Sequence, residues 1–234
     1  MDLDLSSYEL FLFDVDGTMA ETEGLGHLPA FNAAFEQYLL PWRWDAQAYR
    51  ELLKITGGFE RLKAYRSSVE PVADGESLPS DALLKQLHLS KNQIYDSLMK
   101  EGKVTARPGL VNFINQISSH DKSWGIVTTT SYSNWSSLWR SVLQKEMHRP
   151  PVVVVCGEDV AKKKPDPEAY HLAMQKMGVP PDICLAIEDS DNGLMSARQA
   201  GLEVVVVKSQ FFADGNFSGA KLITNEFSDL MPIF

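Results

Sequence analysis

Phe11-Leu-Phe-Asp-Val-Asp-Gly-Thr18 is the stretch that decides the fold of this chain. Its apolar half is typical of a buried strand, and its end carries two carboxylates, Asp14 and Asp16. Residues two apart along a strand project to the same side, so both carboxylates point the same way. Gly17 then lets the backbone turn sharply. Because ligands bind at the carboxyl ends of strands in open parallel sheets, this stretch predicts a site where the strand ends.

Short apolar runs alternate with helical patterns along most of the chain. The apolar spacing within Leu110–Ile117 is that of one buried helix face. A second helix is expected at Pro167–Met177, with Asp166 as its N-cap and Gly178 past its end, and a third at Asn192–Ala200. This alternation predicts an α/β core: a Rossmann-like, doubly wound parallel sheet covered on both faces. The expected strands are Glu9–Phe13, Ser123–Val127, Val152–Cys156, Ile183–Ile187 and Val204–Val207.

Residues 24–102 interrupt this alternation. Their apolar residues recur at helical spacing and form no convincing strand pattern. The sequence therefore predicts an all-helical module inserted after the first strand, with linkers near 20–26 and 101–107. The α/β core is expected to comprise residues 1–23 and 103–234.

The composition excludes several classes of protein. The chain has 234 residues, 44% of them hydrophobic, and a formal net charge of −9. These values suit a globular core and supply no broad positive surface for nucleic acid. No apolar run reaches the ~18 residues of a membrane span, and the first residues lack the basic start of a signal peptide. Cys156 and Cys184 lie among apolar residues and are typical of buried thiols in a reducing compartment. We therefore expect a soluble cytoplasmic protein, a monomer or weak homo-oligomer, with no nucleic-acid or membrane partner.

Other strand ends add polar groups at the same edge of the sheet. Thr128–Ser131 follow one expected strand and offer hydroxyls and backbone N–H groups to an oxyanion. Glu188 and Asp189 follow another strand, and Lys162–Lys164 lie in the loop after a third. Each feature alone has an ordinary explanation, since threonine favours strands and a lysine run is usually a solvated face. Their combined order predicts that carboxylates, hydroxyls and an ammonium surround one site.

A calcium-binding loop is the obvious alternative for an Asp-x-Asp-Gly string. Such a loop needs glycine at its sixth position and glutamate at its twelfth, whereas this chain has Met19 and Leu25 there. The calcium loop is therefore excluded.

In order and spacing, these residues resemble the signature of the haloacid dehalogenase superfamily of phosphohydrolases, over almost the whole chain. The resemblance implies that Asp14 is the nucleophile and Asp16 the general acid/base. It implies that Thr128 contacts the phosphate and that Lys164 stabilises the nucleophile and the phosphoryl oxygens. The inserted helices resemble the cap that closes over substrates in this superfamily. The implied ligands of Mg²⁺ are Asp14, the backbone carbonyl of Asp16, Glu188 and Asp189.

These residue types suit phosphoryl transfer. Charge repulsion opposes the attack of a carboxylate on a phosphate dianion, and it falls when cations neutralise both partners. Mg²⁺, a hard ion that binds oxygen, and Lys164 would supply such charge. An aspartyl-phosphate at Asp14 divides a difficult displacement into two steps, in which Asp16 first protonates the leaving oxygen and then deprotonates water. For the first step we expect neighbouring negative charge to favour a protonated Asp16.

Longer stretches extend the resemblance to one branch of the superfamily, the CbbY-type sugar-bisphosphate phosphatases. They are Phe13–Thr18, Ala20–Glu23, His27, Ala30–Asn32, Trp44–Asp45, Tyr49–Leu53, Thr56–Gly58, Glu60–Arg61, Arg107–Gly109, Thr128–Ser131, Lys163–Pro165, Glu188–Ser190 and Asn192–Leu194. Those relatives act on xylulose 1,5-bisphosphate, an inhibitor of the carbon-fixing enzyme Rubisco, and the resemblance implies the same phosphosugar here. The substrate-binding residues that it implies are Glu23, His27, Gly58, Arg61, Thr129 and Thr130.

Two positions depart from the pattern of that branch. Phe59 stands where the relatives usually carry lysine, and Leu28 where they usually carry arginine after the histidine. Both lost cations are of the kind that would grip a second phosphate, and a desolvated charge pair is worth ~2–5 kcal/mol. Arg61 or Lys63 could replace them, or the substrate could carry a single phosphate.

Ordinary explanations remain open for three of the implied substrate-binding residues. Glu23 also fits a solvated loop carboxylate, and His27 a residue at a helix start. Arg61 also fits a plain surface cation.

A second function fits the same catalytic residues equally, and two others fit them less completely. A phosphosugar mutase of the β-phosphoglucomutase type has the same catalytic residues and returns the phosphoryl group to the substrate rather than to water. A non-catalytic binding module would leave the reacting groups without a role. A dehalogenase would leave Asp16 and the acidic metal positions without one.

Overall fold

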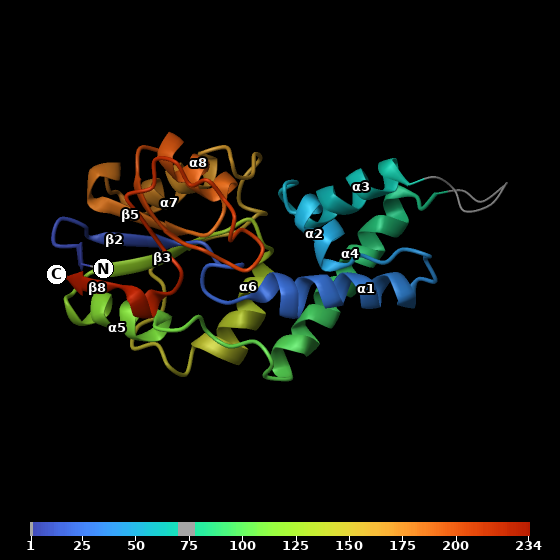
Figure 1. The fold of residues 1–234 in the computed structure, drawn as a ribbon, viewed down its shortest axis with the longest axis horizontal. Coiled ribbons are helices and arrows are strands. Elements are labelled where there is room, and N and C mark those ends of the chain that lie inside the picture. The colour runs from blue at the N-terminus through green and yellow to red at the C-terminus, as the bar shows by residue number, and fades with distance from the viewer. Residues whose placement is uncertain (1, 70–77) are drawn as a thin grey trace.

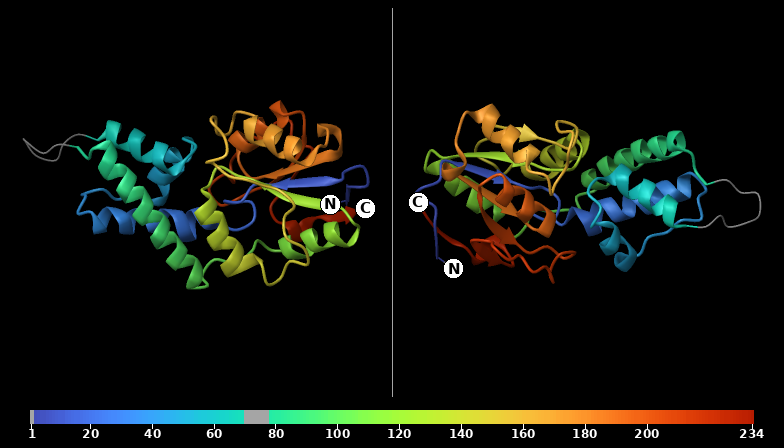
Figure 2. Two further views of the ribbon diagram at one scale, coloured as in Figure 1. Left: turned by 180° about the vertical axis from the view of Figure 1, so that it is seen from behind. Right: turned by 90° about the horizontal axis from the view of Figure 1, so that it is seen from above.

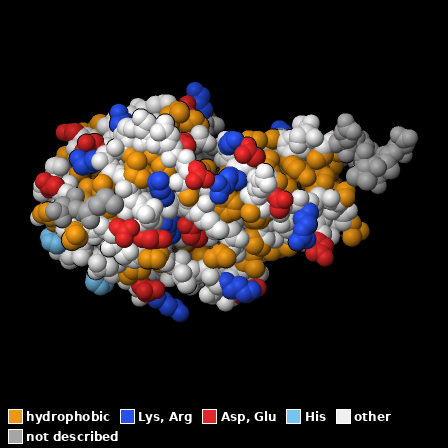
Figure 3. Space-filling model, viewed as in Figure 1, with side chains coloured by type: hydrophobic (Ala, Val, Ile, Leu, Met, Phe, Trp, Pro, Cys, Tyr) orange, Lys and Arg blue, Asp and Glu red, His pale blue; other side chains and the backbone are white. Residues whose placement is uncertain are grey.

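The computed structural model describes residues 2–69 and 78–234, and it has two ends of different architecture (Figure 1). One end holds a six-stranded sheet with helices on both faces, and both chain termini lie there. The other end consists of helices and is the narrower of the two (Figure 3). On the face shown in Figure 3, acidic and basic side chains are interspersed.

The sheet is parallel throughout, with its strands in the order β4-β3-β2-β5-β6-β7. In register, Phe13 of the central strand β2 is paired with Ile126 of β3 on one side and with Ile187 of β5 on the other. The carboxyl ends of these three strands therefore meet at one edge, which confirms the expected parallel core. The strands are β2 (Leu10–Phe13), β3 (Ser123–Val127), β4 (Val154–Val155), β5 (Cys184–Glu188), β6 (Glu203–Val207) and β7 (Leu222–Thr224).

Both faces of the sheet are buried, which explains why its strands are apolar throughout. Alternate residues of a strand point to opposite faces, so Phe11 and Phe13 pack into one core and Leu10 and Leu12 into another. The first face is covered by two helices and the second by two others (Figure 2). They are α5 (Leu110–Ser119) and α6 (Tyr132–Leu138), then α7 (Glu168–Met177) and α8 (Asp191–Gln199).

One strand is shorter than expected. The run Val152–Cys156 contributes only Val154–Val155, because β4 lies at the sheet edge and pairs with β3 alone. Pro150 and Pro151, just before it, have no N–H for a ladder. The other expected strands and the helices expected at 167–177 and 192–200 agree with the structure to within one residue at each end.

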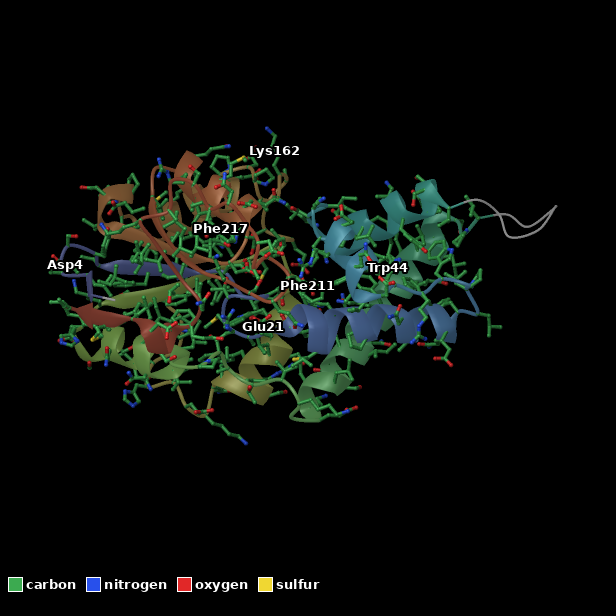
Figure 4. The ribbon with its side chains drawn as sticks, in the orientation of Figure 1. Asp4, Glu21, Trp44, Lys162, Phe211 and Phe217 are labelled. Atoms are coloured by element: carbon green, nitrogen blue, oxygen red, sulfur yellow. The ribbon has the colours of Figure 1, made fainter. Side chains whose placement is uncertain are left out.

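The helical end forms a module with its own aromatic core. No strand occurs in residues 24–69 and 78–102, as the sequence predicts for an inserted helical segment. Phe31, Phe35, Trp44 and Tyr49 pack together, and Phe211 joins them from the loop after β6, at the junction of the two ends (Figure 4). The module consists of η1 (Glu23–His27), α1 (Leu28–Gln37), α2 (Ala46–Leu52), α3 (Gly58–Ser68) and α4 (Asp81–Lys100).

A small parallel pair joins the two termini, β1 (Asp2–Asp4) with β8 (Met231–Ile233). In the described part of the chain, no helix has the length and apolar character that crossing a membrane requires. The remaining short helical turns are η2 (Trp139–Leu143), η3 (Pro181–Ile183) and η4 (Phe227–Asp229).

Candidate active site

Asp14 lies directly after β2, and its side chain is buried where the central strands end. Lys164 reaches it from the loop between β4 and α7, and its Nζ donates a hydrogen bond to Asp14 Oδ1 at 2.8 Å. The same Nζ donates to Glu188 Oε1 at 2.6 Å and to the carbonyl of Val127 at 2.7 Å. The ends of β2, β3 and β5 therefore converge on one buried ammonium.

Three carboxylates lie close together at this site, and two of them contact the ammonium. One carboxylate oxygen from each of Asp14, Glu188 and Asp189 lies within 4.8 Å of the others, a grouping that could hold a metal ion. Tyr170 Oη donates to Glu188 Oε1 at 2.5 Å. Glu188 Oε2 and Asp189 Oδ2 are buried and have no hydrogen-bond partner. Buried polar atoms are normally paired, so these two oxygens indicate a missing cationic or hydrogen-bonding group.

The pKa values reflect this excess of negative charge. Burial raises the pKa of Asp14 to about 7, although the Lys164 ammonium opposes the rise. Burial and the neighbouring Asp14 charge hold the pKa of Asp189 well above its ordinary value. Burial alone would lower the pKa of Lys164, but the carboxylates of Asp14 and Glu188 outweigh it and raise this pKa. Lys164 is therefore charged at neutral pH.

Two glycines leave room for the acidic cluster. Gly17 has φ +89°, and a Cβ on it would lie 2.0 Å from Asp189 Oδ2. A Cβ on Gly193 would lie 1.9 Å from Glu188 Oε2. Any larger residue at either position would displace a carboxylate.

Asp16 lies apart from this cluster and faces the helical module. Its Oδ1 accepts hydrogen bonds from Thr22 Oγ1 at 2.6 Å and from His27 Nε2 at 2.9 Å. Burial alone would raise the pKa of Asp16, but the His27 charge and the bonds from His27 and Thr22 hold it well below its ordinary value. The expectation that neighbouring negative charge favours protonation of Asp16 is therefore wrong for this structure, because two donors face the carboxylate.

Lys91 completes this arrangement from α4. Its Nζ lies 2.6 Å from His27 Nδ1, and the His27 ring stacks on Tyr95 with ring centroids 4.4 Å apart. The sequence analysis did not single out Lys91, although a signal existed. It lies at helical spacing from Leu84, Leu87 and Tyr95, so it occupies the buried stripe of α4. A lysine in such a stripe indicates a specific partner.

We expect Lys91→Met to stabilise the fold and to lower activity. Burial lowers the pKa of Lys91 to about 7, although the carboxylates of Glu23 and Asp16 oppose this. The unfolded chain therefore binds more protons than the folded one between about pH 7 and 10.5, and the burial cost is greatest below pH 7. The variant should gain on the order of a few kcal/mol at pH 6, with a smaller gain at pH 9.5.

Urea denaturation at the two pH values measures this gain. Lys85→Met, in an exposed position of the same helix, is the matched control and should change little at either pH. A variant that is less stable than the parent protein at pH 6 would contradict the inference that the buried charge of Lys91 destabilises the fold.

Glu23 and Arg61 meet within the helical module. Tyr49 Oη donates to Glu23 Oε2 at 2.5 Å, and Arg61 Nη2 lies 3.8 Å from Glu23 Oε1. Arg61 Nε also donates to the carbonyl of Ile55 at 2.9 Å. Glu23, His27 and Arg61 are all buried, so a solvated loop carboxylate and a plain surface cation do not describe them.

Residues from both ends of the molecule line one cavity. Thr128 and Glu188 do not line it. Both are buried, Thr128 Oγ1 accepts the Thr130 N–H at 3.2 Å, and Glu188 Oε1 accepts a hydrogen bond from Lys164. The contact of Thr128 with phosphate stays a prediction. The expected site residues that line the cavity are Asp14, Asp16, Glu23, His27, Gly58, Arg61, Thr129, Thr130, Lys164 and Asp189.

The cavity also contains polar residues that the sequence analysis did not single out: His88, Lys91, Asn134 and Glu158. Asn134 Oδ1 is buried without a hydrogen-bond partner, and Asn134 Nδ2 donates to Asn92 Oδ1 of α4 at 3.2 Å. Burial lowers the pKa of His88 to about 4, so His88 is neutral at pH 7. These groups lie together only because the helical module packs against the core. No local sequence pattern predicts that contact.

Comparison with known proteins agrees with this geometry. The chain matches the family model of the haloacid dehalogenase-like hydrolases over residues 11–207. Protein CbbY of Rhodobacter capsulatus is 40% identical over 209 residues, 89% of this chain and 89% of that protein. The crystal structure of CbbY from Rhodobacter sphaeroides in complex with phosphate is 36% identical, with a TM-score of 0.86 over 97% of each chain. A mutant of that protein in complex with xylulose-(1,5)bisphosphate is 35% identical, with the same TM-score and coverage.

The chain therefore belongs to the haloacid dehalogenase-like hydrolases. Within them it is a phosphatase related to CbbY. The fold and activity class that the sequence predicts are confirmed.

Proposed function

We propose that this phosphatase hydrolyses a small phosphosugar, xylulose 1,5-bisphosphate, with Mg²⁺ and through a phosphorylated Asp14. The observation that carries the proposal is the position of Asp14. Its carboxylate lies at the cavity, 2.8 Å from the Lys164 ammonium, beside two further carboxylates that have unpartnered oxygens.

The donor set fits Mg²⁺. Asp14, Glu188 and Asp189 offer oxygens only, which is what this hard cation prefers, and two of those oxygens lack partners. When bound, Mg²⁺ would neutralise the carboxylates and the phosphoryl oxygens and lower the pKa of Asp14, so that it is ionised for attack. The backbone carbonyl of Asp16 is a further proposed ligand.

In the first step, an Asp14 oxygen attacks phosphorus and the bond from phosphorus to the sugar oxygen breaks. Asp16 gives its proton to that leaving oxygen, while Lys164 and the Thr128–Thr130 segment stabilise charge on the phosphoryl oxygens. In the second step, water attacks phosphorus, its proton returns to Asp16, and Asp14 is released as a carboxylate. The phosphate dianion adds the negative charge that protonation of Asp16 requires, because free Asp16 has a low pKa.

Residues 24–102 act as a cap in this proposal. The cap supplies His27, Gly58 and Arg61, and Glu23 lies directly before it. The rest of the core supplies Thr129, Thr130 and the catalytic residues. Closing the cap would exclude water that competes with the sugar hydroxyls for these groups.

The bisphosphate is supported by the cations of the cavity. Lys91 and Arg61 line it together with Lys164, although Phe59 and Leu28 stand where the related proteins usually carry two further cations. Lys63 does not line the cavity and lies 5.8 Å from the centroid of the Phe59 ring, so it is a poor substitute. The crystal structure of the related CbbY mutant with xylulose-(1,5)bisphosphate supports the same choice.

A phosphate-release assay tests the proposal directly. Xylulose 1,5-bisphosphate and singly phosphorylated sugars are supplied with and without Mg²⁺, and free phosphate and rearranged sugar are both quantified. We expect release that requires Mg²⁺ and is fastest with the bisphosphate. Rearranged sugar without release of phosphate would identify the protein as a mutase. Faster release from singly phosphorylated sugars would exclude the bisphosphate as the preferred substrate.

We expect Phe59→Lys to increase the preference for the bisphosphate over a singly phosphorylated sugar by about tenfold or more. Phe59 lines the cavity, so an ammonium there would face the second phosphate. The ratio of the two kcat/KM values measures the preference. Phe59→Met removes the ring without adding charge and is the control. If both variants leave the ratio unchanged, position 59 does not face a second phosphate.

A further inference from the structure

One ion pair joins the cap to the loop that carries the catalytic lysine. Lys163 Nζ donates to Glu60 Oε1 at 2.7 Å, from the β4–α7 loop to the first turn of α3. Both residues line the cavity. Their side chains are 26% and 44% exposed, so the pair lies at the cavity mouth rather than on the open surface.

The two partners are each adjacent in sequence to a residue of the site. Lys163 precedes Lys164, whose Nζ bonds Asp14 and Glu188. Glu60 precedes Arg61, which contacts Glu23. Because each partner is covalently linked to its neighbour by one peptide unit, a displacement of Lys163 would also move Lys164, and a displacement of Glu60 would also move Arg61.

The local packing leaves the pair little freedom. A Cβ on Gly57 would lie 2.1 Å from Glu60 Oε2 and 2.7 Å from Lys163 Nζ, so both side chains pack against this glycine. Gly57 has φ +100°, a backbone conformation that favours glycine. Burial alone would raise the pKa of Glu60, but the hydrogen bond from Lys163 lowers it, so the carboxylate is ionised at neutral pH.

A second ion pair crosses the same boundary and provides a comparison. Arg50 Nη1 of α2 lies 3.1 Å from Asp214 Oδ2 of the core, with side chains 44% and 89% exposed. Exposed pairs of this kind contribute little, because water and salt screen them. The half-buried pair Glu60–Lys163 interacts more strongly.

We propose that Glu60 and Lys163 form a clasp that holds the cap closed and positions Lys164 for catalysis. The clasp rests on the proposed function only in assuming that the closed cap is the reactive form. Opening the cap separates two charges at the cavity mouth and releases the backbone next to Lys164. Neither clasp residue needs to touch the substrate, so both act as positioning residues.

Kinetics on p-nitrophenyl phosphate with Mg²⁺ test the clasp without reliance on the sugar substrate. Glu60→Gln, Lys163→Met and the double variant should each lower kcat/KM by about tenfold, with no further loss in the double variant. Part of the loss should be in kcat, because without the ion pair Lys164 is out of position in the enzyme–substrate complex. The exchange of Glu60→Lys with Lys163→Glu should restore at least part of the rate. Arg50→Gln and Asp214→Asn are the matched controls and should stay within about twofold.

A distance measurement reads cap closure without any substrate. Spin labels are placed at Leu89→Cys in the cap and Val152→Cys in the core, both exposed positions, while the native cysteines are buried. Glu60→Gln and Lys163→Met should both shift the label distances towards longer values, and the charge exchange should shift them back.

Three results would overturn the clasp. If Glu60→Gln leaves kcat/KM and the spin-label distances unchanged, the ion pair does not hold the cap closed. A loss confined to Lys163→Met would show that Lys163 meets the substrate directly. Additive losses would show that the two residues act separately. Failure of the proposed function is distinct from these, since it would leave the distance shifts intact while xylulose 1,5-bisphosphate is not hydrolysed.

Discussion

Asp14→Asn abolishes phosphate release in this account, lowering kcat by at least about 10⁴-fold. The amide keeps the shape of the side chain and its place beside Lys164, but it is no nucleophile towards phosphorus. Substrate affinity should change much less than kcat, because the cap residues and Lys164 remain. Phosphate release measures kcat, and titration with the unhydrolysed substrate measures affinity.

Asp121→Asn is the control for this substitution, since the Asp121 side chain is 89% exposed and lies outside the cavity. It should leave kcat unchanged. Residual turnover of Asp14→Asn within about tenfold of the parent enzyme would mean that another group, or water itself, attacks the phosphorus.

Lys164→Met should damage both catalysis and stability. In the proposed reaction it removes the positive charge that stabilises the phosphoryl oxygens, and loss of one such contact typically costs about 10²–10³-fold in kcat. It also leaves Asp14 and Glu188 buried without their ammonium partner, a loss of roughly 3–5 kcal/mol for a buried pair. The loss of stability should be larger at pH 8 than at pH 5, because protonation of the carboxylates relieves their repulsion.

Urea denaturation in the presence of a metal chelator measures this loss. Lys162→Met is the matched control, since Lys162 belongs to the same loop and its side chain is 75% exposed, near the molecular surface (Figure 4). Added Mg²⁺ should narrow the gap between Lys164→Met and the parent protein. A variant as stable as the control at pH 8 would contradict the role of Lys164 as the counter-ion of the acidic cluster.

The core could be predicted because its signals are local. Strands buried on both faces read as short apolar runs, and the carboxylates that follow Phe13 and Ile187 stand next to those runs in the sequence. The parallel sheet then brings these strand ends together without further information. The two edge strands differ from the prediction, since the apolar run of β4 is longer than the part that pairs and β7 is not among the expected strands.

The cap side of the site could be predicted only in part. Glu23 and His27 were expected from the family resemblance, but their partners Tyr49 and Lys91 lie 26 and 64 residues further along the chain. Phe211 enters the aromatic core of the cap from the loop after β6, far along the chain from its partners. Such contacts depend on how the helical module and the core meet, and hydrophobic periodicity does not encode that arrangement.

The low pKa of Asp16 has the same origin. Its sequence neighbours include Asp14, which favours a raised pKa, whereas its spatial neighbours Thr22 and His27 donate to it. The sequence thus misjudged the resting charge of Asp16, and the role of Asp16 as general acid/base stays a prediction.

Trapping the phosphorylated enzyme shows whether Asp14 is the nucleophile. Asp16→Asn lacks the base for the second step, whereas p-nitrophenyl phosphate has a leaving group that needs no protonation, so the intermediate should accumulate. After an acid quench, mass spectrometry of the peptides should find one phosphoryl group, on Asp14. A quenched enzyme that carries no phosphoryl group, or carries it on another residue, while phosphate is still released would contradict the account.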